Sequence, residues 1–214
     1  MINHKEFIKY CHAAYAGNID AFEEELFIKG KTKFYYGDSL HKYTVEHDDY
    51  YVIVFRGSEN KFDWLNDFTF NAVDFNHTNI HQGFFCALEA ELNPRLQYDK
   101  PVYITGHSFG GALALLEANR LSECDVDVRE VVTFGSPMVG AMSFKENYEH
   151  QLGDKTTRYI NGDDIVPSLP PLKYYQVGKS ISIGKKSSWF NPLKYYRMIH
   201  SHHIEQYVAE MEKT

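Results

Sequence analysis

The chain has 214 residues, of which 43% are hydrophobic and 24% charged, a composition that excludes a disordered polypeptide. The formal net charge of −7 argues against a nucleic-acid-binding surface, because phosphate recognition needs clustered lysine and arginine. No run approaches the roughly 20 apolar residues that a membrane-spanning helix needs, and the first residues lack the apolar core of a secretory signal. We therefore expect a single domain over residues 1–214 in the cytoplasm, with export by a route that uses no cleaved signal left open.

The predicted elements alternate between helices and short strands along the chain. Apolar side chains recur at helical spacing over residues 4–16, which predicts a helix with one buried face. Two β-rich runs, residues 41–46 and 51–55, flank an Asp-Asp pair and predict a hairpin. Further helices are expected at 83–92 and 112–121, and further short strands at 101–105, 131–134 and 158–160. This alternation indicates the α/β class, with a mostly parallel central sheet flanked by helices.

A GxSxG motif, Gly106-His107-Ser108-Phe109-Gly110, lies between a predicted strand and a predicted helix. Such a serine occupies a very tight strand-to-helix turn, and side chains two positions either side would collide, so glycine is required there. The amides at the start of the following helix stabilise the negative charge that develops on the reacting carbonyl oxygen. A bare GxSxG also arises by chance, so the flanking elements carry the argument. We predict that Ser108 is a catalytic nucleophile.

Five blocks occur in order along the chain: VIVFRGSENKFDWLNDFTF, IHQGFFCAL, ITGHSFGGALALLEA, VVTFGSPMVG and INGDDIVPSLPP. Together they resemble the class 3 lipases, the family that includes the fungal triacylglycerol lipases, over about Val52 to Tyr207. The resemblance implies the α/β-hydrolase fold and a serine esterase or lipase that hydrolyses acyl esters of lipids through an acyl-serine intermediate. It implies no cofactor.

The resemblance also implies roles for individual residues. Ser108 matches the nucleophile, and Asp164, directly before an Ile-Val-Pro sequence, matches the acid of the catalytic triad, whereas the adjacent Asp163 matches no role. Ser58 and Phe109 match the two residues that form the oxyanion hole. The chain order of serine, acid and histidine is the order that α/β-hydrolases use.

Three histidines compete for the role of the base, because residues 200–203 read His-Ser-His-His. His202 fits the family pattern best, since an isoleucine and a tyrosine follow it at plus two and plus five. His203 ranks second and His200 third. A metal site is the rival explanation for this cluster, but no carboxylate or thiol pattern accompanies it, so we expect no metal.

Four large apolar residues follow the Ser58 block at close spacing: Phe62, Trp64, Leu65 and Phe68. In the fungal relatives this segment is a lid that covers the site and opens at a lipid surface, so the resemblance implies a lid and a contact with substrate. A short helix permanently packed on the core is the alternative, and both interpretations stay open.

Residues 172–199 are rich in basic and aromatic side chains and contain no acid. Basic and aromatic residues interleaved in this way suit a transient contact with anionic lipid headgroups. The alternative, which we favour, is a hairpin in which residues 179–184 form an exposed edge strand protected by lysines.

The expected partner is a lipid or small ester substrate, with no nucleic acid. Other reactions on the same triad stay open, namely hydrolysis of the phospholipase A1 type, acyl transfer and thioester hydrolysis. A catalytically silent lipase-like binding module is the rival from another class of protein.

Overall fold

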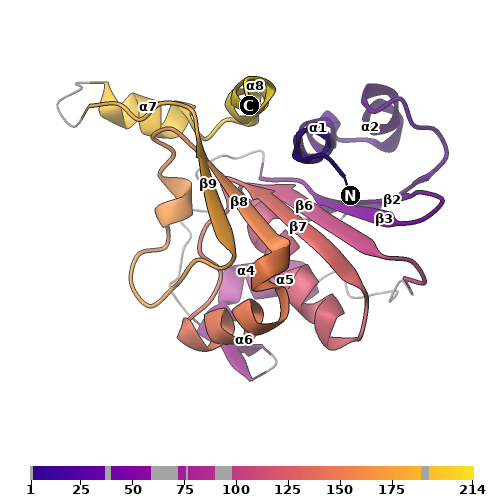
Figure 1. Cartoon of the computed structure of the whole chain (residues 1–214), viewed down its shortest axis with the longest axis horizontal. Coiled ribbons are helices and arrows are strands. Elements are labelled where there is room, and N and C mark those ends of the chain that lie inside the picture. Colours follow the sequence, from indigo (N-terminus) through magenta and orange to yellow (C-terminus); the bar gives the residue numbers. More distant parts are fainter. Residues whose placement is uncertain (1, 37–39, 59–71, 76, 90–97, 189–192) are drawn as a thin grey trace.

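The computed structural model describes residues 2–36, 40–58, 72–75, 77–89, 98–188 and 193–214. Its central sheet has the strand order β1-β2-β3-β6-β7-β8-β9 (Figure 1). The bounds are Thr32–Tyr36 for β1, His41–Glu46 for β2, Tyr51–Phe55 for β3, Val102–His107 for β6, Val128–Phe134 for β7, Thr156–Asn161 for β8 and Lys179–Ile183 for β9. Strands β1, β2 and β3 pair antiparallel, and the pairs from β3 to β9 are parallel. The predicted hairpin and the mostly parallel sheet are therefore confirmed.

Helices cover both faces of the sheet (Figure 1). On one face lie α4 (Gln82–Glu89), α5 (Phe109–Glu123) and α6 (Met142–Leu152), and on the other α1 (His4–Ala13), α2 (Ile19–Glu25) and α8 (Ile204–Glu212). Strand β3 contributes to both cores, because successive side chains on a strand point to opposite faces. Ile53 and Phe55 join the cluster under α5, and Val52 and Val54 join the cluster under α1. This double burial explains why β3 reads as a continuous apolar run.

Smaller elements complete the described chain. A two-stranded sheet pairs β4 (Ala72–Phe75) with β5 (Thr78–His81), and three short 3₁₀ turns occupy Ala14–Ala16, Gly153–Lys155 and Val166–Ser168. Helix α7 (Lys194–His200) precedes α8 and extends beyond the edge of the sheet in Figure 1. None of the described helices has both the length and the apolar character needed to cross a bilayer. The cytoplasmic location stays a prediction.

The structure corrects the favoured interpretation of residues 179–184 in one respect. Strand β9 does lie at the sheet edge, as expected, but it pairs parallel with β8 and so does not belong to a hairpin. Parallel neighbours require a long crossover that returns the chain to the same end of the sheet, and residues 162–178 supply it.

Candidate active site

Ser108 lies on the turn between β6 and α5, at the carboxyl ends of the parallel strands. Its backbone has φ 57° and ψ −128°, a conformation that costs of order 1–3 kcal/mol in a residue with a side chain. The Ser108 amide donates to the carbonyl oxygen of Phe134 at 2.9 Å. The strained turn is therefore held in place by the end of β7.

The two glycines of the motif are required for different reasons. A Cβ atom at Gly106 would overlap the backbone of Gly110, so this requirement arises within the turn. A Cβ atom at Gly110 would instead overlap the carbonyl oxygen of Phe55, at the end of β3. The second requirement comes from the close packing of α5 against a neighbouring strand, and only glycine permits that approach.

Three side chains from distant parts of the sequence meet at this turn. The Ser108 hydroxyl donates to Nε2 of His202, with 2.7 Å between the two atoms. The other ring nitrogen, Nδ1, donates to Oδ2 of Asp164 at 2.8 Å. Only one neutral tautomer of the imidazole satisfies both contacts. The structure thus brings together Ser108, Asp164 and His202, which are 5%, 7% and 3% exposed and so largely shielded from water.

The competing histidines lie elsewhere. His200 is exposed on α7, where its ring stacks on that of Tyr196 with 5.5 Å between the centroids. His203 is the N-terminal cap residue of α8, and its Nδ1 lies 3.9 Å from a carboxylate oxygen of Glu205. Of the three, His202 is the one that contacts both Ser108 and Asp164.

The adjacent aspartates point in different directions. Asp163 accepts hydrogen bonds from the backbone amide of Ser187 at 2.9 and 3.0 Å, and its Oδ2 lies 3.2 Å from Nε of Arg197. It therefore anchors the segment that leads into α7. Of this pair, Asp164 is the residue that contacts His202.

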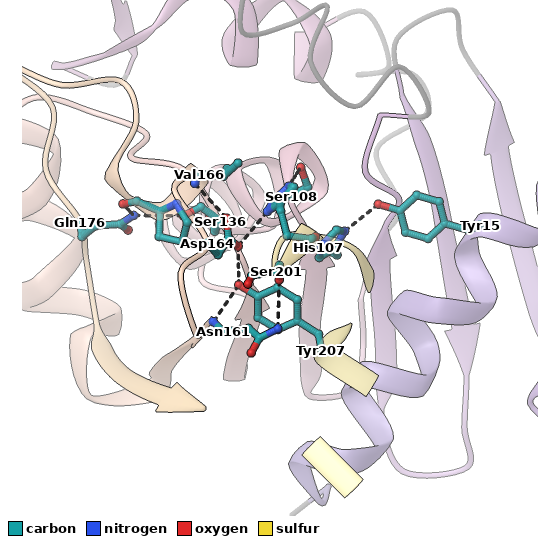
Figure 2. A network of polar contacts seen from close by, with 12 residues as sticks. Tyr15, His107, Ser108, Ser136, Asn161, Asp164, Val166, Gln176, Ser201 and Tyr207 are labelled. Carbon is teal, nitrogen blue, oxygen red and sulfur yellow. Dashed lines mark hydrogen bonds and ion pairs between the residues drawn. The ribbon is translucent and has the colours of Figure 1, made fainter. Parts of the chain in front are cut away.

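Asp164 is held by two further donors (Figure 2). The backbone amide of Val166 donates to its Oδ1 at 2.9 Å, and the Tyr207 hydroxyl donates to its Oδ2 at 2.6 Å. The Tyr207 oxygen in turn accepts from the amide of Asn161 at 3.1 Å. Burial, and the charge of Asp164 beside it, raise the pKa of Tyr207 well above its ordinary value, so this hydroxyl keeps its proton and remains a donor. In the sequence Tyr207 served only to mark the register of His202, and its contact with the carboxylate was missed.

We expect Tyr207→Phe to lower the free energy of unfolding by about 2 kcal/mol, because a buried hydrogen bond to a charged group is lost and the Asn161 amide loses its acceptor. Urea unfolding followed by circular dichroism measures this change. Tyr43→Phe is the matched control, since Tyr43 is also fully buried but donates to a neutral carbonyl, that of Ala14, at 3.3 Å. Equal losses in the two variants would contradict the prediction.

A third glycine, Gly135, keeps the acid and the base in contact. It follows β7 with a φ of 61°, in the left-handed region that favours glycine. A Cβ atom there would lie 2.9 Å from Oδ2 of Asp164 and 3.0 Å from the ring of His202. Any side chain at this position would therefore press the carboxylate and the imidazole out of place. Gly135 belongs to the VVTFGSPMVG block, but no pattern in that block indicated that the residue lies against Asp164 and His202.

The two predicted oxyanion residues adjoin backbone that lies close to Ser108. Phe109 begins α5, and the amides of a first helical turn have no acceptor within the helix, so its N–H group is suited to bind an oxyanion. A Cβ atom at Gly57, the neighbour of Ser58, would lie 3.2 Å from Cβ of Ser108. The backbone that leads into Ser58 therefore passes close to Ser108.

The predicted lid residues, Phe62, Trp64, Leu65 and Phe68, fall outside the described residues. Their role stays a prediction. Within the described ranges, no group of three or more histidine, cysteine or acidic side chains is arranged to hold a metal ion.

Known proteins resemble this chain in sequence and in structure. The family model Lipase (class 3) matches residues 52–174. A lipase from Rhizomucor miehei is 31% identical over 187 residues, which cover 77% of this chain and 51% of the relative. A chloroplastic phospholipase A1-Igamma2 from Arabidopsis thaliana is 42% identical over 82 residues, which cover 35% of this chain and 15% of the relative. The chain thus spans about half the length of the first of these relatives and less of the second.

The solved structure of Rhizomucor miehei triacylglyceride lipase superposes with a TM-score of 0.66 at 26% identity, covering 85% of this chain and 79% of that one. This agreement confirms the α/β-hydrolase fold. The family match spans more than half of the chain and includes Ser58, Ser108 and Asp164. The chain belongs to the class 3 lipase family.

Proposed function

We propose that this protein is a serine esterase or lipase that hydrolyses the acyl esters of lipids. One observation carries the proposal: the Ser108 hydroxyl, the His202 imidazole and the Asp164 carboxylate form a continuous chain of hydrogen bonds. A serine hydroxyl is a weak nucleophile until a neighbouring imidazole accepts its proton, and the carboxylate orients that imidazole and stabilises its charged form.

The proposed reaction has two steps. Oγ of Ser108 attacks the ester carbonyl carbon while Nε2 of His202 accepts the hydroxyl proton. The bond to the leaving alcohol then breaks, His202 returns the proton to that alcohol, and an acyl-serine remains. Water attacks the acyl-serine with the same proton transfers and releases the carboxylic acid. The amide of Phe109 and the residue Ser58 stabilise the oxyanion in both steps, and no cofactor takes part.

The relatives support lipids as the substrate class. One is a lipase and another is a phospholipase A1, so both glycerides and phospholipids are candidate substrates. A panel of esters that differ in chain length and headgroup, extended to a phospholipid and a thioester, separates these candidates, with Ser108→Ala as the blank. An added alcohol acceptor reveals acyl transfer.

Labelling with a fluorophosphonate tests the proposal against a silent binding module. We expect one equivalent of probe on the wild-type protein and none on Ser108→Ala. A wild-type protein that hydrolyses no ester of the panel and takes up no probe would overturn the proposed function.

We further propose that the enzyme contacts an anionic lipid surface through helix α7 and the exposed residues that precede it in the sequence. Leu193, Tyr195 and Tyr196 are 62%, 76% and 63% exposed, and Lys185 and Lys186 are exposed nearby in the sequence. Helix α7 extends away from the sheet in Figure 1, and it ends two residues before His202. Exposed aromatic side chains beside basic ones suit the headgroup region of an anionic bilayer.

We expect the double variant Lys185→Glu, Lys186→Glu to lower affinity for vesicles containing phosphatidylserine by at least about tenfold, because each basic residue near such a surface is worth roughly 1 kcal/mol. Co-sedimentation with vesicles, with and without the anionic lipid, measures this. Phe27→Ala is the control and should leave vesicle binding unchanged. Phe27 is also an exposed aromatic residue, with 98% of its surface exposed, but it follows α2 rather than lying near α7. An affinity for vesicles that changes neither with the anionic lipid content nor in the double variant would refute the surface contact.

A further inference from the structure

A second histidine, His107, lies beside the base and is not explained by the triad. It is 4% exposed, and its ring stacks on that of His202 with 4.9 Å between the centroids. Its Nε2 lies 2.8 Å from the backbone carbonyl oxygen of His202. Because a carbonyl oxygen can only accept, the proton of the His107 ring must be on Nε2. His107 therefore holds the backbone of the residue whose side chain reaches Ser108.

The other nitrogen of His107 is paired with a tyrosine from the N-terminal part of the chain. The Tyr15 hydroxyl lies 2.7 Å from Nδ1 of His107, as Figure 2 shows. Burial raises the pKa of Tyr15, so the hydroxyl keeps its proton at neutral pH. Tyr15 then donates to Nδ1, and this contact requires the same tautomer of His107, with the proton on Nε2.

Tyr15 also contacts the strand end that carries the predicted oxyanion residue. A Cβ atom at Gly57 would overlap the Tyr15 hydroxyl, so this oxygen packs directly against the backbone next to Ser58. One hydroxyl thus touches the oxyanion side of the site and, through His107, the base side. Tyr15 lies outside residues 52–174, which the family model matches.

We infer that Tyr15 and His107 are positioning residues that together fix His202 against Ser108 and align it with the oxyanion backbone. Tyr15 acts through His107, because its hydrogen bond to Nδ1 holds the ring where Nε2 reaches the His202 carbonyl. Without the Tyr15 hydroxyl, this polar contact at Nδ1 is lost, and the ring can move within its site. The donor that holds the His202 backbone would then move with it, and His202 would shift relative to the serine.

The inference rests on the proposed function only for its kinetic test. We expect Tyr15→Phe to lower kcat for ester hydrolysis about tenfold with KM unchanged, a part of the ~100-fold that a 1 Å misplacement of a catalytic group costs. His107→Leu should lose at least as much. His107→Gln should recover most of the activity, because the glutamine amide can still donate to the His202 carbonyl.

Tyr10→Phe is the matched control. Tyr10 lies on α1, and its hydroxyl contacts Nε2 of His47 at 2.9 Å, so this variant removes a tyrosine-histidine bond that is not in the site. Its kcat should equal that of the wild type. In the His107→Leu background, Tyr15→Phe should cost less than twofold, because the partner through which it acts is gone. Equal costs in both backgrounds, or a change in KM alone, would overturn the inference.

Nitrogen NMR of the histidine rings tests the same inference without any substrate. The wild-type protein should show His107 protonated on Nε2 alone. Tyr15→Phe should shift the Nδ1 signal of His107, which loses its hydrogen bond, and also the ring signals of His202, which stacks on His107, while Tyr10→Phe leaves both unchanged. His202 signals that do not respond to Tyr15→Phe would reject the inference even if the protein hydrolyses esters. A response in a protein that hydrolyses no ester would leave the positioning contact standing and reject the proposed function.

Discussion

Ser108→Ala should lower kcat for ester hydrolysis by on the order of 10⁶, since no acyl-enzyme can form without the hydroxyl. The fold should survive, because alanine retains the Cβ atom and the strained turn is held by the Phe134 carbonyl rather than by the serine side chain. Initial rates on the best ester of the panel measure the loss, and the melting temperature verifies that the variant is folded.

The Ser108→Ala substitution also tests whether the triad acts as a unit. Ser108→Ala and His202→Ala should each lose about as much activity as the double variant, because either change removes the same proton transfer. Losses that multiply in the double variant would show that the two side chains act independently. Hydrolysis by Ser108→Ala at even 1% of the wild-type rate would reject Ser108 as the nucleophile.

Asp164→Asn should lower kcat by about 10⁴, the magnitude that a wrong imidazole tautomer costs in a serine triad. The Val166 amide requires an oxygen at the Oδ1 position, so the new NH₂ group would occupy the Oδ2 position. That position now accepts from His202 and Tyr207, and an NH₂ group cannot accept from either. His202 would take the tautomer with its proton on Nε2, and Nε2 could then no longer accept the proton of Ser108.

Asp163→Asn is the control, since it makes the same chemical change one residue away. Asp163 contacts Ser187 and Arg197 rather than the base, so we expect its kcat to stay within about twofold of the wild type. A larger loss in Asp163→Asn than in Asp164→Asn would mean that the acid of the triad has been assigned to the wrong aspartate.

Some of the elements that went unpredicted carried a readable signal and some did not. Strand β1 (Thr32–Tyr36) reads TKFYY, a β-branched and aromatic run that favours a strand. Helix α6 (Met142–Leu152) buries only Phe144, Tyr148 and Leu152 among charged and polar residues, so its apolar stripe is narrow. Strands β4 and β5 are short, and they form because they pair with each other rather than because either has a strand-like sequence pattern.

The residues around the triad divide in the same way. The turn that carries Ser108 was predictable because a tight turn imposes glycines at fixed offsets from a serine, and those offsets are visible in one short segment. Tyr207, Gly135 and Tyr15 had no such signal. Each acts by touching a residue more than 25 positions away, and a contact between distant segments leaves no local spacing to read.

The fold class and the family could be predicted from the sequence, as could the two candidate triad residues in recognisable blocks, Ser108 and Asp164. The sequence also limited the candidate base to three histidines within four positions and ranked His202 first. The contacts that distinguish His202 arise from the fold, because the carboxyl ends of β6 and β8 place Ser108 and Asp164 at the same end of the sheet, and the turn before α8 directs His202, rather than His200 or His203, between them. Spacing along a chain sets which residues share a turn, but the distance between two turns depends on how strands are ordered in the sheet.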